Sequence, residues 1–306
     1  MRKIGAIKMN EHMNGLNNAD RAQVLVEARP YIQKYYGKVI VVKYGGNAMI
    51  NEVLKHDVMR DMVLMSLIGV KVVLVHGGGP EISSMLKRVG KVSEFVDGLR
   101  VTDEETSEIV QMVLAGKINK SLVAKLELLG GRAMGVCGMD GNLLKAKMVD
   151  ERLGYVGEIS KVDPTLINDL LEKGYIPVVS TIGCDETGHV YNINADTAAA
   201  AIAGALQAEA LISMTDTIGL LMDPKDPTTL IRRIDLAGCE ELKERGVISG
   251  GMIPKVECCT NAIQDGVRKV FIIDGRVPHA LLIECLTDEG AGTMFKKELT
   301  PHYSVG

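Results

Sequence analysis

A run of β-branched apolar residues that ends in a lysine and a pair of glycines restricts what this chain can fold into. Residues 39–42 are all Val or Ile, and Lys43, Tyr44, Gly45 and Gly46 follow them. Such a run is typical of a strand buried on both faces of a parallel sheet. Adjacent glycines let backbone N–H groups approach an anion, and open α/β sheets bind ligands at the carboxyl ends of their strands. The stretch therefore predicts a phosphate site at the end of a central strand.

A second stretch has the same design. Residues 72–75 form another apolar run, and His76 and a triple glycine, residues 77–79, come directly after it. Pro80 suits the first turn of a helix, whose free N–H groups would point back at the glycines. Glycines also serve simply to make tight turns between strands and helices. Two such turns at the ends of two apolar strands favour an anion site.

Most of the remaining chain alternates predicted helices with predicted strands. Helices are expected at 51–68, 81–89, 103–129, 164–173, 195–206, 236–245, 252–265 and 278–285. Strands are expected at 132–137, 175–181, 210–214 and 269–273, and at 143–149 beyond a hairpin turn at Asp140 and Gly141. This alternation predicts an α/β fold with an open, mainly parallel sheet sandwiched by helices. Residues 1–306 would then form one domain with two lobes, 37–208 and 209–306, and a cleft between them.

A helix is also predicted at 18–36, before the first core strand. Asn18 or Asp20 would cap it, and Pro30 should kink or break it near Arg29. The sheet does not need this helix as a flanking layer. We therefore expect it to act as an arm.

Composition excludes several classes of protein. A net charge of −4 argues against nucleic acid or an anionic membrane as the main partner. No apolar run is long enough to span a membrane, and residues 1–18 contain no apolar signal-peptide core. The six cysteines form no C-x-x-C pair and no histidine lies at zinc-like spacing, so we expect reduced thiols, a cytoplasmic location and no structural metal.

Two lysines and an aspartate are the candidate catalytic residues. Lys43 ends a buried strand, and Lys255 lies in the first turn of a helix, where a cation opposes the helix dipole unless an anion balances it. Asp196 opens the alanine-rich helix and could orient the two ammonium groups. Each has a simpler interpretation: Lys43 could be a surface lysine, and Asp196 could be the N-cap of the helix. Together with the glycine turns, these residues predict phosphoryl transfer with no covalent intermediate.

Further polar residues are candidates for binding the substrate. Asn192 and Asn194 alternate on a short predicted strand and could face one ligand, and Arg100 could clamp a carboxylate or form a surface ion pair. The chain has no G-x-x-x-x-G-K-[ST] segment, no H-R-D or D-F-G, and no G-x-G-x-x-G in either glycine cluster. These absences exclude P-loop proteins and protein kinases and disfavour a nicotinamide dehydrogenase.

Six stretches together resemble the amino acid kinase family: residues 42–49, 75–80, 97–102, 191–196, 250–255 and 272–278. The similarity extends over about residues 18–295 and is greatest to the branch that phosphorylates N-acetyl-L-glutamate in arginine biosynthesis. It implies the fold of that family, ATP as phosphoryl donor with Mg²⁺ bound through its phosphates, and N-acetyl-L-glutamyl 5-phosphate as product.

The resemblance also implies roles for individual residues. The lysines that match Lys43 and Lys255 stabilise the transition state in that family, and the aspartate that matches Asp196 organises them. The matches to the N-acetyl-L-glutamate site are Gly78, Gly79, Arg100, Asn192 and Asn194. The matches to the ATP site are Gly45, Gly46, Thr215, Asp216, Gly219 and Met252. Thr217 departs from the valine or isoleucine that the family pattern leads us to expect.

Regulation is implied as well. Only the arginine-inhibited branch has a helix like 18–36, which interlaces with its twofold mate and joins dimers into a hexamer. Arginine would bind between this helix and the C-terminal lobe, and the matching residues are Tyr31, His279, Glu284, Gly290 and Gly292. Whether a PII signalling protein docks on such a hexamer is left open. The alternatives are another member of the family, of the glutamate 5-kinase or aspartokinase type, or a non-catalytic arginine sensor.

Overall fold

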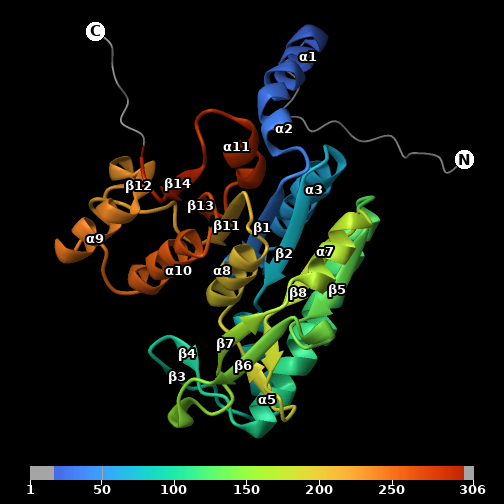
Figure 1. The fold of residues 1–306 in the computed structure, drawn as a ribbon, viewed down its shortest axis with the longest axis vertical. Helices are drawn as coiled ribbons and strands as arrows, with labels where there is room; N and C mark the ends of the chain where they lie inside the picture. Colours follow the sequence, from blue (N-terminus) through green and yellow to red (C-terminus); the bar gives the residue numbers. More distant parts are fainter. Residues whose placement is uncertain (1–16, 50, 300–306) are drawn as a thin grey trace, which may run out of the picture.

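The computed structural model describes residues 17–49 and 51–299. Its central sheet has eight strands in the order β12–β14–β13–β11–β1–β2–β8–β5 (Figure 1). These strands are β1 (Val39–Tyr44), β2 (Lys71–His76), β5 (Ala133–Cys137), β8 (Ile176–Ser180), β11 (Ala210–Thr215), β12 (Arg233–Asp235), β13 (Val270–Asp274) and β14 (Gly292–Lys296). All neighbours are parallel except β13 and β14. The predicted open, mainly parallel sheet is confirmed.

Helices cover both faces of this sheet. Ile40 and Val42 of β1 enter one hydrophobic core and Val41 enters the other, so β1 is buried on both faces as expected. One core includes α3 (Glu52–Leu67), α4 (Gly79–Arg88), α5 (Glu104–Gln111), α6 (Asn119–Leu128) and α11 (Ala280–Leu286). The other includes α7 (Thr165–Glu172), α8 (Ala195–Ala205), α9 (Leu236–Glu244) and α10 (Met252–Gln264).

Smaller elements bring two predicted binding residues toward the glycine turns. A four-stranded sheet has the order β10–β9–β6–β7, and its last strand in the chain, β10, packs against α5 and ends at Asn192. Its strands are β6 (Leu144–Met148), β7 (Gly157–Val162), β9 (Ile182–Cys184) and β10 (Val190–Asn192). The hairpin of β3 (Phe95–Val96) and β4 (Leu99–Arg100) carries Arg100.

The structure corrects the hairpin predicted at Asp140 and Gly141. A tight turn does form there, at Asp140–Asn142, but β5 before it pairs with β8 while β6 after it pairs with β7 and β9. The turn passes the chain from the large sheet to the small one. Strands β7, β12 and β14 were not predicted at all, and the long helix predicted at 103–129 contains a π-helical segment, Met112–Ile118, between α5 and α6.

The arm is present and projects from the body of the molecule (Figure 1). It consists of α1 (Asn18–Glu27) and α2 (Arg29–Tyr35), so the break near Arg29 that Pro30 predicts is confirmed. The cap was assigned wrongly: Asn17 is the N-cap of α1, in a capping box with Asp20. No residue of α1 is buried, whereas Tyr35 at the end of α2 joins the core.

Candidate active site

Lys43, Asp196 and Ser213 meet at the carboxyl ends of two neighbouring strands. Lys43 and Ser213 pair in register across β1 and β11. The ammonium nitrogen of Lys43 lies 3.0 Å from Asp196 Oδ1, and the hydroxyl of Ser213 donates to the same oxygen at 3.0 Å. Nearly all of the Lys43 side chain is buried, and one fifth of the Asp196 side chain is exposed. The pair therefore faces an opening to solvent.

The first turn of α8 sets the position of Asp196. Asn194 is the N-cap, and its side-chain oxygen accepts the N–H groups of Asp196 and Thr197 at 2.9 and 3.2 Å. Asp196 is therefore not the cap, and its carboxylate is left to pair with Lys43. Asn194 lies beyond the end of β10, so it does not alternate with Asn192 on one strand as predicted.

Lys255 approaches the same carboxylate from the first turn of α10. Lys43, Asp196, Ser213, Lys255 and Cys258 line one small cavity. Burial raises the pKa of the Asp196 carboxyl, but the charges of Lys43 and Lys255 and the bond from Ser213 lower it more, so the net shift is downward. A carboxylate that stays ionised holds the ammonium group of Lys43 near the opening and attracts that of Lys255.

The glycine turn after β2 and the predicted substrate residues line a neighbouring cavity of about 170 Å³. Gly78, Gly79, Arg100, Asn192 and Asn194 all contribute to its wall. A larger cavity of about 720 Å³ shares Asn194 with it and shares Asp196 and Lys255 with the lysine cavity. The three cavities therefore adjoin one another, and together we call them the cleft, with the two lysines at one end and Arg100 at the other.

Arg100 is a buried cation with no carboxylate partner among the described residues. Its guanidinium donates to Ser93 Oγ at 2.5 Å, to Ser83 Oγ at 2.9 Å and to the carbonyl of Gly79 at 3.0 Å, and it lies 4.6 Å from the centre of the Phe95 ring. Burial lowers its pKa from the ordinary value. Three of its five N–H donors are bonded, so two remain to bind an anion in the cleft.

The residues matched to the ATP site are only partly gathered. Gly46 has φ of +70° and lies against Asp216, whose carboxylate oxygens would be 3.0 Å from an added Cβ. Thr215 ends β11, and its hydroxyl accepts the N–H of Thr217 and bonds the Thr217 hydroxyl at 2.9 Å. Gly219 is packed closely, since an added Cβ would lie 2.6 Å from Thr293 Oγ1. The tight packing of Gly219 gives it a structural role in this loop. Met252 is the first residue of α10.

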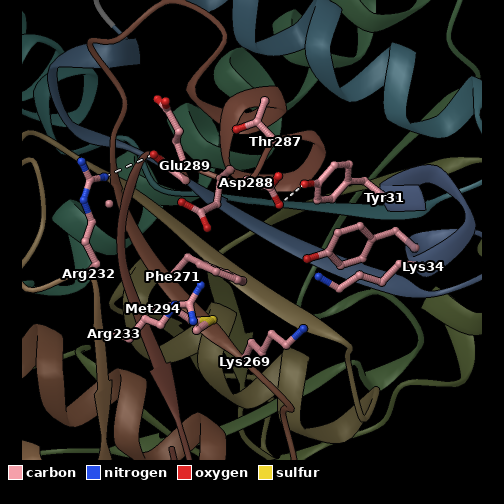
Figure 2. Close-up of a pocket in the computed structure, with 14 residues that line it drawn as sticks. Tyr31, Lys34, Arg232, Arg233, Lys269, Phe271, Thr287, Asp288, Glu289 and Met294 are labelled. Atoms are coloured by element: carbon pink, nitrogen blue, oxygen red, sulfur yellow. Dashed lines mark hydrogen bonds between the residues drawn. The ribbon is translucent and has the colours of Figure 1, made fainter. Parts of the chain in front are cut away.

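A separate cavity, of about 430 Å³, lies between α2 of the arm and side chains from residues 232–294 (Figure 2). Tyr31, Glu284, Gly290 and Gly292, which the resemblance matches to the arginine site, line it. The Tyr31 hydroxyl bonds Asp288 across it, and Glu284 accepts the N–H of Ala291 at 2.6 Å. Burial raises the pKa of Glu284. Acidic side chains and the basic side chains of Lys34, Arg232, Arg233 and Lys269 therefore share one cavity.

His279 does not line this cavity. Its Nδ1 lies 2.6 Å from Oδ1 of Asp61, a buried carboxyl on α3. The residues predicted to bind free arginine thus lie around one cavity, except for His279. Lys34 and Lys269 line this cavity as well. No local sequence pattern indicated these two lysines, because they come from α2 and from the residue before β13.

The donors in the cleft suit phosphate groups. Lys43, Lys255 and the glycine N–H groups are all positive or hydrogen-bond donors. Within residues 17–49 and 51–299, no three His, Cys, Asp or Glu side chains gather to hold a metal ion. The six cysteines are free, and no described helix has the length and apolarity needed to cross a membrane.

Comparisons with known proteins agree with this architecture. The chain is 56% identical over 288 residues to acetylglutamate kinase of Brachyspira hyodysenteriae, covering 94% of this chain and 100% of that one. It is 54% identical to acetylglutamate kinase of Clostridium beijerinckii, covering 91% and 99%. These similarities confirm the branch that the six stretches indicated.

A solved structure and a family model agree with the fold. N-acetylglutamate synthase of Neisseria gonorrhoeae, solved with coenzyme A and N-acetyl-glutamate, superposes with a TM-score of 0.80 at 26% identity. The match covers 91% of this chain but only 64% of the synthase chain. The model of the amino acid kinase family matches residues 38–274. The chain is therefore a kinase that belongs to the amino acid kinase family.

Proposed function

We propose that this kinase transfers the γ-phosphoryl group of ATP to the side-chain carboxylate of N-acetyl-L-glutamate, forming N-acetyl-L-glutamyl 5-phosphate in arginine biosynthesis. The observation that carries the proposal is the row of adjoining cavities, which extends from the Lys43–Asp196–Lys255 cluster to the cavity of Arg100 and Asn192. A dicarboxylic substrate needs a cation at the end remote from the reaction. Arg100 supplies it, and the relatives named acetylglutamate kinase support the choice of substrate.

The mechanism follows from where charge develops. A carboxylate oxygen of the substrate attacks the γ-phosphorus, the bond to the ADP oxygen breaks, and negative charge spreads over the transferred group. Lys43 and Lys255 meet that charge, and Asp196 holds their ammonium groups in place. Mg²⁺ bound through the phosphates supplies further neutralisation. No residue of the chain becomes phosphorylated.

A substrate panel tests this proposal. N-acetyl-L-glutamate, L-glutamate and L-aspartate are compared with ATP and Mg²⁺ in a coupled ADP-release assay. The expected result is turnover of N-acetyl-L-glutamate far above the other two. Preferred turnover of glutamate or aspartate would identify another member of the family, and no turnover at all would favour a non-catalytic sensor.

We also propose that arginine inhibits the enzyme from the cavity beside the arm, within a homohexamer in the cytoplasm. Glu284 offers a carboxylate for a guanidinium, and Lys34 and Lys269 offer charge for the carboxylate of the amino acid. The six free thiols support a reducing compartment. The panel is therefore repeated with millimolar arginine, which should lower the rate; an unchanged rate would reject this regulation and leave the kinase activity standing.

A further inference from the structure

His76 is a buried histidine that contacts the glycine turn and that the reaction does not use directly. It ends β2 and is fully inaccessible to solvent. Its Nδ1 lies 3.0 Å from the carbonyl oxygen of Gly77, and its Nε2 lies 3.2 Å from the amide nitrogen of Asn119. Each ring nitrogen thus has one neighbour, and the identity of those neighbours decides which nitrogen carries the proton.

The orientation of the Asn119 amide is fixed by its other contacts. Its nitrogen lies 2.8 Å from the carbonyl of Val178 and 3.2 Å from that of Val136, so it must be the donor, and its two hydrogens are shared among these carbonyls and Nε2 of His76. Its oxygen accepts from the ammonium group of Lys120 at 3.1 Å. An amide nitrogen cannot accept a hydrogen bond, so Nε2 of His76 must be the acceptor. The proton is therefore on Nδ1, which donates to the carbonyl of Gly77.

The hydrogen bond from His76 to the carbonyl of Gly77 also fixes the direction of the Gly78 N–H. The carbonyl of Gly77 and the N–H of Gly78 belong to the same peptide unit, and the described residues contain no cis peptide bond. In a planar trans unit the C=O and N–H bonds point in opposite directions. Holding the carbonyl toward His76 directs the N–H of Gly78 away from it. Gly78 lines the cleft, and no described residue accepts its N–H.

We propose that His76, held in its Nδ1–H tautomer by Asn119, is a positioning residue that keeps the Gly78 N–H directed at an anionic group bound in the cleft. The proposal rests on the function proposed above for that cleft. Burial is the main reason that the pKa of His76 is lowered to about 4, with the Gly77 bond acting the other way and Lys120 adding to the lowering. The ring is therefore neutral at physiological pH, as one acceptor and one donor require.

The π-helical segment before Asn119 sets the position of that residue. The π-helical segment Met112–Ile118 ends at the residue before it, and Asn119 is completely buried. π-Helical turns are rare and occur frequently at functional sites. The same segment packs against the glycine turn, because an added Cβ on Gly78 would lie 2.2 Å from Cδ1 of Ile118.

Two matched variants separate positioning from packing. In His76→Asn the side-chain amide reaches the place of Nδ1 and can still donate to Gly77, while the acceptor for Asn119 is lost. In His76→Gln the side chain reaches the place of Nε2 and can still accept from Asn119, while Gly77 loses its donor. Each variant loses one hydrogen bond, so the two should have similar melting temperatures.

Their activities should differ. We expect kcat of His76→Gln to fall about 10- to 100-fold, below the loss typical for a deleted transition-state donor because the N–H is misaligned but still present. His76→Asn should stay within about threefold of the parent, and KM for ATP should change little in either. Equal losses in the two variants, or losses that follow the melting temperature, would overturn the proposal.

The tautomer of His76 can also be measured directly on the unmodified protein. ¹⁵N NMR of the His76 ring should show protonated Nδ1 and bare Nε2 from pH 5 to 8, and an Nε2–H tautomer would overturn the proposal. The ring measurement does not depend on the substrate, and the variants are compared on whichever acceptor the parent phosphorylates. Failure of the substrate panel is thus distinguishable from failure of this inference.

Discussion

At the scale of single residues, Lys43 pairs with Asp196, and the charge of Lys255 acts on the same carboxylate. Lys43→Ala and Lys255→Ala should each reduce kcat by about 10²–10³, because each removes a group that meets charge developing in the transition state. KM values should change much less. Steady-state kinetics at saturating ATP checks this, with Lys243→Ala as a control, since Lys243 pairs with Glu257 on the surface. Near-normal turnover of either active-site variant would show that the assignment is wrong.

Arg100 should behave differently, because it is placed to bind the substrate at the end remote from the reaction. Arg100→Lys keeps a positive charge but cannot reproduce the bonds to Ser83, Ser93 and the carbonyl of Gly79. We expect it chiefly to raise KM for N-acetyl-L-glutamate, by about tenfold or more, a cost of about 1.4 kcal/mol or more in binding. A raised KM for ATP with an unchanged KM for the acceptor would place Arg100 at the wrong end of the cleft.

His76 should also make stability depend on pH. Its pKa is lowered from 6.5 to about 4 in the folded protein, mainly by burial, so the unfolded chain binds a proton first as pH falls. Stability from this group is therefore present above about pH 6.5 and is lost between pH 6.5 and 4, by about 2 kcal/mol from pH 7 to pH 5.

Urea unfolding of the parent and of His76→Asn at pH 7 and pH 5 checks this. Asp61, whose pKa burial raises to about 6, acts in the opposite direction over this range but is common to both proteins. The difference between them isolates His76. Identical losses of stability on acidification would show that His76 does not titrate in this way.

Some site residues could be predicted from the sequence and others could not. Lys43, Asp196 and Lys255 were predicted because each follows a local signal, a strand end or a helix start, and such ends converge at one edge of a parallel sheet. Asn119 lies 43 positions from His76, so their contact depends on the π-helical segment and the sheet order. Ser213 was missed for a similar reason: a serine inside an apolar strand has no distinctive local pattern.

At the scale of elements, the first turn of α8 joins stability to catalysis. Asn194→Ala removes the acceptor for the N–H groups of Asp196 and Thr197 and should cost about 1 kcal/mol of unfolding free energy. It should also lower kcat, because Asp196 is less firmly placed. Asn194→Ser keeps a cap without adding charge, so it should restore stability and kcat in urea unfolding and kinetic assays. A stable, fully active Asn194→Ala would show that the cap does not position Asp196.

Strands were predicted correctly where their side chains are buried on both faces. The prediction failed where the fold depends on which strands pair with each other. The apolar runs of β1 and β2 are buried on both faces and were easy to recognise. At Asp140–Asn142 the local turn was predicted correctly, with Gly141 at φ of +60°, but its strands pair with other partners. Strand β14 pairs with β12 on one side and with β13 on the other at the edge of the sheet, which no local pattern indicates.

At the scale of the whole molecule, the arm presents apolar side chains that no described residue covers. Val24, Leu25 and Val26 are 56%, 74% and 60% exposed, and α1 buries no residue of its own. A single exposed apolar residue needs no explanation, but three in succession on a projecting helix favour a partner. The arm of a second copy of this chain would supply the matching surface in the proposed hexamer.

Deleting residues 1–28 should therefore change assembly without damaging the catalytic core. The deletion removes α1 but keeps Tyr31, Lys34 and the buried Tyr35 of α2. We expect light scattering to show a hexamer for the full chain and an active dimer for the shortened one, with kcat within about twofold because the cleft lies far from the arm along β1.

Sensitivity to arginine should fall sharply, since its cavity is completed by α2, which α1 anchors in the assembly. A full-length variant, Val24→Asp with Leu25→Asp, is the matched test, because it keeps every backbone atom and replaces apolar surface with carboxylates. A full chain that is a dimer and ignores millimolar arginine would contradict both the assembly and the regulation.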